Sequence, residues 1–124
     1  MDNIEFAEMM RSRTKSFALR IIKLYQNLPK SDESRIIGKQ LLRSATSVAA
    51  NYRAASRARS GPEYYAKICI VVEETDEALF WIEILEESHL ITLNKLSSLK
   101  QEIAELVAIF SKTKSSLRPK TNAN

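Results

Sequence analysis

The residues that could do chemistry are few and stand apart from one another along the 124-residue chain. Glu86 and His89 have the Glu-x-x-His spacing of a carboxylate-bridged di-iron bundle, but that site needs two such motifs and the chain has one histidine. Cys69 is the only cysteine in the sequence, so we interpret it as a small residue of the core. The sequence therefore predicts no metal site and no cofactor.

Two further patterns resemble catalytic or phosphate-binding motifs but lack the partners of those motifs. Ser97 and Lys100 have a serine–lysine spacing, and the companion motifs of serine–lysine enzymes are missing. Gly38-Lys39 lacks the upstream glycine of a phosphate-binding loop. Asn51 borders an apolar stripe, and we interpret it as a structural hydrogen-bonding residue. We expect no enzyme active site, no catalytic residue and no small-molecule substrate.

A stripe of basic residues follows Asp32 and is the strongest pattern for binding. On a helical wheel, five of these cations fall within about 80° of one another, nearly opposite an apolar stripe. Such an edge could follow a nucleic-acid backbone, because each Lys or Arg displaces condensed counterions. The same side chains could instead pair with acids of a neighbouring subunit, or simply be solvated. The candidate nucleic-acid-binding residues are Arg35, Lys39, Arg43, Arg53, Arg57 and Arg59.

Four long segments must position these residues, and each repeats apolar residues at the spacing of one helical face. The clearest stripes are Thr14, Phe17, Ile21, Leu24 and Leu28 in the first segment, and Leu96, Leu99, Ile103, Leu106 and Phe110 in the fourth. The breaks between segments are short, and short connections between long helices force antiparallel neighbours. We predict an all-α fold, an antiparallel up-and-down four-helix bundle over residues 1–115, and a disordered C-terminal tail over residues 116–124.

The third segment, which opens at Ser60 and ends near His89, is apolar on two sides of the helical wheel. The predicted inward stripe comprises Tyr65, Ile68, Val72, Thr75, Leu79 and Ile82. The second apolar patch comprises Ile70, Phe80, Trp81 and Ile84. Because large exposed apolar patches mark interfaces, we predict that this second patch meets another copy of the chain. The alternative is a broad core covered by Phe6, Met9 and Met10.

Charge is segregated along the chain, which has a net charge of +4. Residues 1–67 hold 13 Lys or Arg against six Asp or Glu, a net of +7. Residues 68–94 hold seven acids and no Lys or Arg, a net of −7, and residues 95–124 hold six bases and two acids, a net of +4. The basic zones favour an acidic partner such as RNA or DNA.

The compartment is predicted from the cysteine count and from the absence of apolar leader segments. One cysteine fits a reducing cytoplasm. Asp2 and Glu5 interrupt the N-terminus, so no signal peptide is expected, and no run of about 18 apolar residues predicts a membrane span. We expect a soluble, cytoplasmic protein with no membrane partner.

Several blocks of this sequence, in this order and spacing, resemble one known family. The longest block is the run QLLRSATSVAANYRAA from Gln40 to Ala55. The other blocks are Arg57-Ala58-Arg59-Ser60, Glu63-Tyr64-Tyr65, Glu73-Glu74-x-Asp76-Glu77 and Phe80-Trp81. Over roughly residues 6–112, they resemble the bacterial four-helix-bundle family named for proteins encoded in 23S ribosomal-RNA intervening sequences.

This resemblance implies an antiparallel four-helix bundle, commonly assembled as a ring-like homopentamer. The family in turn resembles the accessory proteins of diversity-generating retroelements, which are basic, pentameric and nucleic-acid binding. No activity is established for most members, and no catalytic residues transfer. Residues 51–55 read Asn-Tyr-Arg-Ala-Ala where many members have an Asn-Ile-Ala-Glu-Gly-like segment, which leaves the role of this stretch open.

The leading prediction from the sequence is a non-enzymatic, homo-oligomeric helical bundle, pentameric by resemblance, that binds RNA or DNA backbone through its basic face. The alternative is a protein-interaction scaffold with no nucleic-acid partner, in which the arginines make contacts between subunits.

Overall fold

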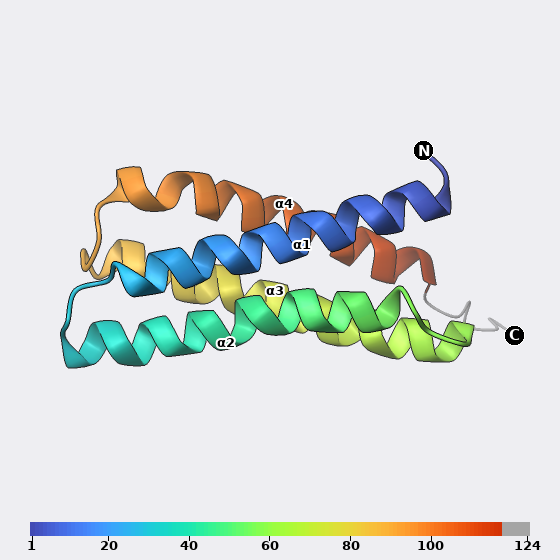
Figure 1. Cartoon of the computed structure of the whole chain (residues 1–124), viewed down its shortest axis with the longest axis horizontal. Helices are drawn as coiled ribbons and strands as arrows, with labels where there is room; N and C mark the ends of the chain where they lie inside the picture. The colour runs from blue at the N-terminus through green and yellow to red at the C-terminus, as the bar shows by residue number, and fades with distance from the viewer. Residues whose placement is uncertain (118–124) are drawn as a thin grey trace, which may run out of the picture.

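Four long helices, joined by short turns, make up the fold in a computed structural model that describes residues 1–117 (Figure 1). Successive helices are joined at alternate ends, so each runs antiparallel to the one before it. The predicted all-α, up-and-down four-helix bundle is confirmed. The helices are α1 (Asn3–Gln26), α2 (Asp32–Ala55), α3 (Gly61–Glu87) and α4 (Leu93–Leu117).

The end of α4 bears on the predicted tail. Helix α4 continues to Leu117, so residues 116 and 117, which were assigned to a disordered tail, are helical. The rest of that predicted tail, residues 118–124, lies outside the described residues.

Serine side chains fix where two of the helices begin. The hydroxyl of Ser31 accepts from a backbone N–H in the first turn of α2, and the hydroxyl of Ser60 accepts from the N–H of Glu63 at 3.2 Å in α3. These bonds satisfy donors that have no partner inside the helix. The carboxylate of Glu63 accepts from the N–H of Arg59 at 3.1 Å, so the turn before α3 is held from both sides.

The core is formed where each helix packs against the next in sequence, with α2 and α3 in the most extensive contact. All ten residues of the two stripes predicted in the first and fourth segments are buried. Helices α1 and α4 approach each other at fewer places. Arg13 links them by donating to both carboxylate oxygens of Glu102, at 2.7 and 3.1 Å.

The buried face of α3 differs from the predicted stripe. Ile68, Thr75 and Ile82 are buried as predicted, whereas Tyr65, Val72 and Leu79 are only partly buried. The other fully buried positions of the helix are Val71, Ala78 and Leu85. The reason is that α3 packs against two neighbours, α2 and α4. Its buried face therefore lies between the side that contacts α2 and the side that contacts α4, and a prediction from one apolar stripe is displaced from it.

Gly38 lies at the closest approach of α2 to the end of α1. A Cβ atom at this position would lie 2.7 Å from Cδ1 of Leu28 and 2.9 Å from Cδ1 of Tyr25, both closer than van der Waals contact. Gly38 therefore lets α2 come this close without displacing the side chains of Leu28 and Tyr25, even though glycine lowers the helix propensity of this segment.

Replacing Gly38 by leucine is expected to destabilise the bundle by about 2 kcal/mol, because overpacking outweighs the gain in helix propensity. Urea denaturation followed by circular dichroism measures this change. Gly61→Ala is the control, because no atom lies within 4 Å of a Cβ there and the substitution should be nearly neutral. Equal midpoints for the two variants would contradict the close approach.

Tyr52 is buried, and this burial makes stability depend on alkaline pH. Desolvation raises the pKa of Tyr52 to about 12, from an ordinary value of 10.0. The stabilisation is fully present below pH 10 and is lost as the pH rises to about 12, because only the unfolded chain ionises easily in that window. We expect the free energy of unfolding to fall by about 2 kcal/mol between these pH values, and to fall less in Tyr52→Phe. Chemical denaturation at several pH values measures the free energy of unfolding of wild-type protein and of Tyr52→Phe. An equal fall with pH in the two proteins would contradict the prediction.

Candidate nucleic-acid interface

The basic stripe predicted on α2 is divided by the structure, and Arg43 leaves it. The guanidinium of Arg43 donates to Glu74 at 3.0 and 3.2 Å and to Glu77 at 2.6 Å, both on α3. The hydrogen bonds that Arg43 donates to these two carboxylates raise the pKa of Arg43, and the bond to Glu77 lowers the pKa of Glu77. The charge of Arg43 is therefore balanced by two acids of its own chain, Glu74 and Glu77, without the help of a neighbouring subunit.

The other members of the stripe separate into two ends of α2. Arg35 and Lys39 are exposed near its start, where Arg35 lies 3.4 Å from the exposed carboxylate of Asp32. Arg53 lies 18 positions after Arg35, which places it about 27 Å away along the helix. Arg53 and Arg57 are exposed near the end of α2, and Arg59 is exposed in the turn before α3. A single continuous contact surface is therefore not formed by α2 alone.

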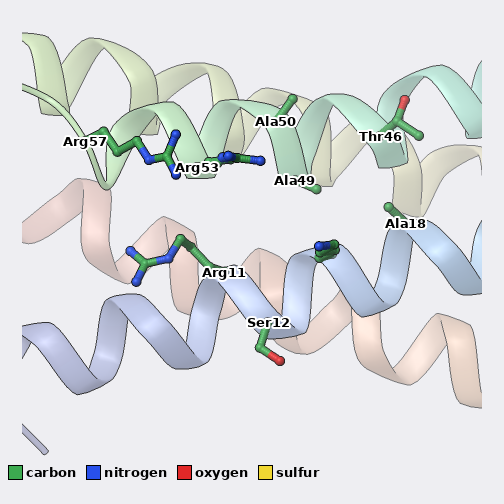
Figure 2. A pocket seen from close by; sticks show the side chains of 9 residues that line it. Arg11, Ser12, Ala18, Thr46, Ala49, Ala50, Arg53 and Arg57 are labelled. Atoms are coloured by element: carbon green, nitrogen blue, oxygen red, sulfur yellow. The ribbon is translucent and has the colours of Figure 1, made fainter.

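Arg53 and Arg57 face a groove of about 690 Å³ between α1 and α2. Figure 2 shows Arg53 and Arg57 on the α2 side of this space and Arg11 on the α1 side. Lys15 of α1 also lines the groove. The remaining lining residues are small: Ser12, Ala18, Thr46, Ala49 and Ala50. We call this feature, defined by these nine residues, the basic groove.

The charge of the basic groove is uncompensated. No acidic residue lines it. Within residues 1–117, none of its four cations (Arg11, Lys15, Arg53 and Arg57) makes a salt bridge. Four like charges around one hollow repel one another, so an anion placed in the groove would be stabilised by all of them.

Comparison with known proteins places the chain in a family. The profile of the 23S rRNA-intervening sequence protein family matches residues 9–112. The chain belongs to this family. The match spans most of all four helices and includes every lining residue of the basic groove.

A solved relative has the same fold. It is a protein of unknown function of the S23 ribosomal protein family from Bacteroides thetaiotaomicron, which is 30% identical to this chain and superposes with a TM-score of 0.78. The alignment covers 85% of this chain and 97% of that protein. Comparison with curated proteins finds no match.

Two of the four cations of the basic groove in this family member, Arg11 and Lys15, were not predicted from the sequence. Both lie on α1, and the helical wheel was drawn for α2 by itself. A signal was present in the sequence: from residue 9 to residue 31 the chain contains no Asp or Glu. An acid-free basic stretch in α1 indicates a positively charged surface. It does not indicate which neighbouring helix supplies the other cations of the groove.

The second predicted site, the apolar patch of α3, lies on another face of the bundle. Phe80 is 48% exposed and Ile70 is 37% exposed, while Trp81 and Ile84 are partly buried. The Phe80 and Trp81 rings meet edge to face with centroids 4.9 Å apart. The Trp81 indole N–H donates to Glu77 at 3.1 Å, so the patch is tied to the Arg43 cluster.

Two residues of the short motifs that resemble catalytic or metal sites are paired with each other. Lys100, of the serine–lysine spacing, donates to Glu86, of the Glu-x-x-His spacing, at 2.7 Å. His89 follows the end of α3 with a φ of 59°, the left-handed conformation typical of a helix C-terminus. Over residues 1–117, no three His, Cys, Asp or Glu side chains gather as metal ligands, and no helix is long and apolar enough to cross a membrane.

Proposed function

We propose that this protein is a non-enzymatic, homo-oligomeric helical bundle that binds the backbone of RNA or DNA in the basic groove. The observation that supports the proposal is the uncompensated cluster of Arg11, Lys15, Arg53 and Arg57, which converge on one hollow without an acidic neighbour. Nucleic acid carries a dense row of phosphates, and Arg and Lys are the residues that contact such a row most often.

The lining of the groove favours backbone contact over base recognition. Between the cations lie alanines and two hydroxyl residues, Ser12 and Thr46. These side chains are short, so a sugar–phosphate chain can come close, and they include no aromatic ring on which a base would stack. The lining also lacks the Asn and Gln amides that read adenine. Binding should therefore depend on charge and be nearly independent of sequence.

Self-association through the apolar patch of α3 is the second part of the proposal. Over residues 1–117, the backbones of α1 and α3 do not approach each other, so these helices occupy diagonal corners of the bundle. A contact between copies at Phe80 and Ile70 would leave the basic groove open. Family resemblance favours a pentamer, and the single cysteine is consistent with the cytoplasm.

A salt titration tests the binding proposal. Fluorescence anisotropy with a labelled 20-base-pair duplex, repeated between 50 and 300 mM NaCl, should give an affinity that falls with a log–log slope at least as steep as about −3 to −4. Four cations that each neutralise a phosphate account for that slope. Absence of binding at 50 mM NaCl, or a slope near zero, would reject the proposal.

Replacing Phe80 by aspartate is expected to convert the oligomer to single chains, because a charge cannot be buried in an apolar contact without a partner. Sedimentation velocity measures the change. The matched control is Ile36→Asp, at an exposed position of α2 outside the patch, which should leave the assembly unchanged. A wild-type chain that sediments as a monomer at high concentration would overturn this part of the proposal.

A further inference from the structure

A second basic hollow lies on the opposite side of α1 from the basic groove. It has a volume of about 430 Å³ and lies between α1 and α4. Three cations line it: Arg20 and Lys23 from α1, and Lys95 from α4. The rest of the lining is Leu24, Asn27, Ile91 and Leu99. We call this hollow, defined by these seven residues, the α4-side pocket.

The cations of the α4-side pocket are also uncompensated. No acid lines the pocket, and within residues 1–117 none of its three cations forms a salt bridge. Arg20 is positioned by a 2.7 Å hydrogen bond to the hydroxyl of Ser98. Lys95 lies in the first turn of α4, which contains no acid, where the partial positive charge of the helix terminus disfavours a cation. An anion in this pocket would relieve that repulsion.

Helix α1 therefore runs as a ridge between two cationic hollows. The basic groove lies beside residues 11–18 of α1, and the α4-side pocket lies beside residues 20–27. Ser12, Ser16 and Leu19 are exposed on α1, and no acid follows Glu8 on this helix. The two hollows thus lie beside successive stretches of α1 that carry no acid of their own, and the acids of α4 nearest to them, Glu102 and Glu105, are paired with Arg13.

The dimensions of this ridge match those of one groove of DNA. An α-helix with its side chains is about 10–12 Å across. The major groove of B-form DNA is about 12 Å wide and admits an α-helix, with a phosphate strand on each side. The major groove of A-form RNA is deep and narrow and does not admit one. A single strand offers one phosphate row, whereas the two hollows lie on opposite sides of α1.

We propose that the ligand is double-stranded DNA, with α1 in the major groove, the basic groove on the phosphates of one strand and the α4-side pocket on those of the other. The proposal rests on the function proposed above and specifies its ligand. The contacts along α1 come from serine hydroxyls and a leucine, so the duplex is held by its shape and phosphates, with little discrimination between base sequences.

The test compares three probes of equal length: duplex DNA, duplex RNA of the same sequence, and single-stranded DNA. The pocket variant carries Arg20→Gln, Lys23→Gln and Lys95→Gln. The control variant carries Lys30→Gln, Lys39→Gln and Lys112→Gln, which removes the same charge outside both hollows. We expect wild-type protein to bind duplex DNA at least about tenfold more tightly than duplex RNA. The pocket variant should bind duplex DNA at least about tenfold more weakly than wild-type protein, and the log–log slope of its affinity against salt should be shallower by about 2.7. Its affinity for single-stranded DNA should be unchanged.

The outcomes separate this inference from the function on which it rests. Equal affinity for duplex DNA and duplex RNA, or equal losses in the pocket and control variants, would overturn the two-strand arrangement. If binding in that case still required the basic groove, the proposed function would stand. Absence of binding to all three probes would overturn both.

Discussion

Reversing the charges of Arg53 and Arg57 together is expected to lower the affinity for duplex nucleic acid by about 100-fold or more at about 0.1 M salt. Each guanidinium is expected to give a charge-assisted hydrogen bond to phosphate, worth about 1.5–3 kcal/mol, and glutamate replaces it with repulsion. Both side chains are exposed and make no salt bridge within residues 1–117. The fold should therefore tolerate the change, and circular dichroism of the variant checks that it does.

A second pair on the same helix gives a matched control for this experiment. Arg35→Glu with Lys39→Glu introduces the same change in net charge, on the same basic stripe, at the end of α2 that does not line the groove. Reversing this pair should lower the affinity for duplex nucleic acid by less than about fivefold, because charges farther than about 10 Å from the site are largely screened at 0.1 M salt. Equal losses for the two pairs would mean that net charge, and not the groove, determines binding.

Phe110→Ala is expected to destabilise the protein by about 3–5 kcal/mol, the usual cost of removing a fully buried phenyl ring. Phe110 has no exposed surface, and its ring centroid lies 5.3 Å from that of Tyr52, which is also buried. The pair joins α4 to α2 across the core. Because domains of this size have only about 5–15 kcal/mol of stability, this loss would remove a large share of the free energy of unfolding.

Urea denaturation of Phe110→Ala and wild-type protein measures this loss. Ile36→Ala is the comparison, because Ile36 is 64% exposed on α2 and its truncation should cost less than about 1 kcal/mol. A cost below 1 kcal/mol for Phe110→Ala would show that the core is not closed around this ring.

The stripes of α1 and α4 could be predicted from the sequence because each helix has one broad apolar side. Thr14 to Leu28 and Leu96 to Phe110 follow a single helical face, and the structure buries every predicted position. The buried face of α3 could not be predicted from a single stripe, because this helix packs against two neighbours. Val71, Ala78 and Leu85 are buried there, while half of the predicted stripe is only partly buried.

The candidate site was predicted in part for a related reason. A helical wheel groups residues of one helix, and Arg53 and Arg57 were found by that method. Arg11 and Lys15 face them only because of how α1 packs against α2, which is a tertiary relation. Likewise, the loss of Arg43 from the stripe depends on Glu74 and Glu77 of a different helix. Periodicity within a helix does not contain that information.

The leading prediction from the sequence combines self-association with nucleic-acid binding, and the diagonal arrangement of α1 and α3 leaves a separate face of the bundle for each. The alternative prediction assigned the arginines to contacts between subunits. Arg43 is occupied by acids of its own chain, the apolar patch lies on α3, and the basic groove lies between α1 and α2. An assembly of copies through α3 would present several basic grooves to one long ligand and raise the overall affinity.

The most direct test of the central claim, that nucleic acid binds in the basic groove, is alanine-methyl NMR during titration with a duplex. The account predicts that the methyl signals of Ala18, Ala49 and Ala50 shift in proportion to bound duplex, while that of Ala66 on α3 does not. Shifts at Ala66 without shifts at Ala49 and Ala50 would contradict it.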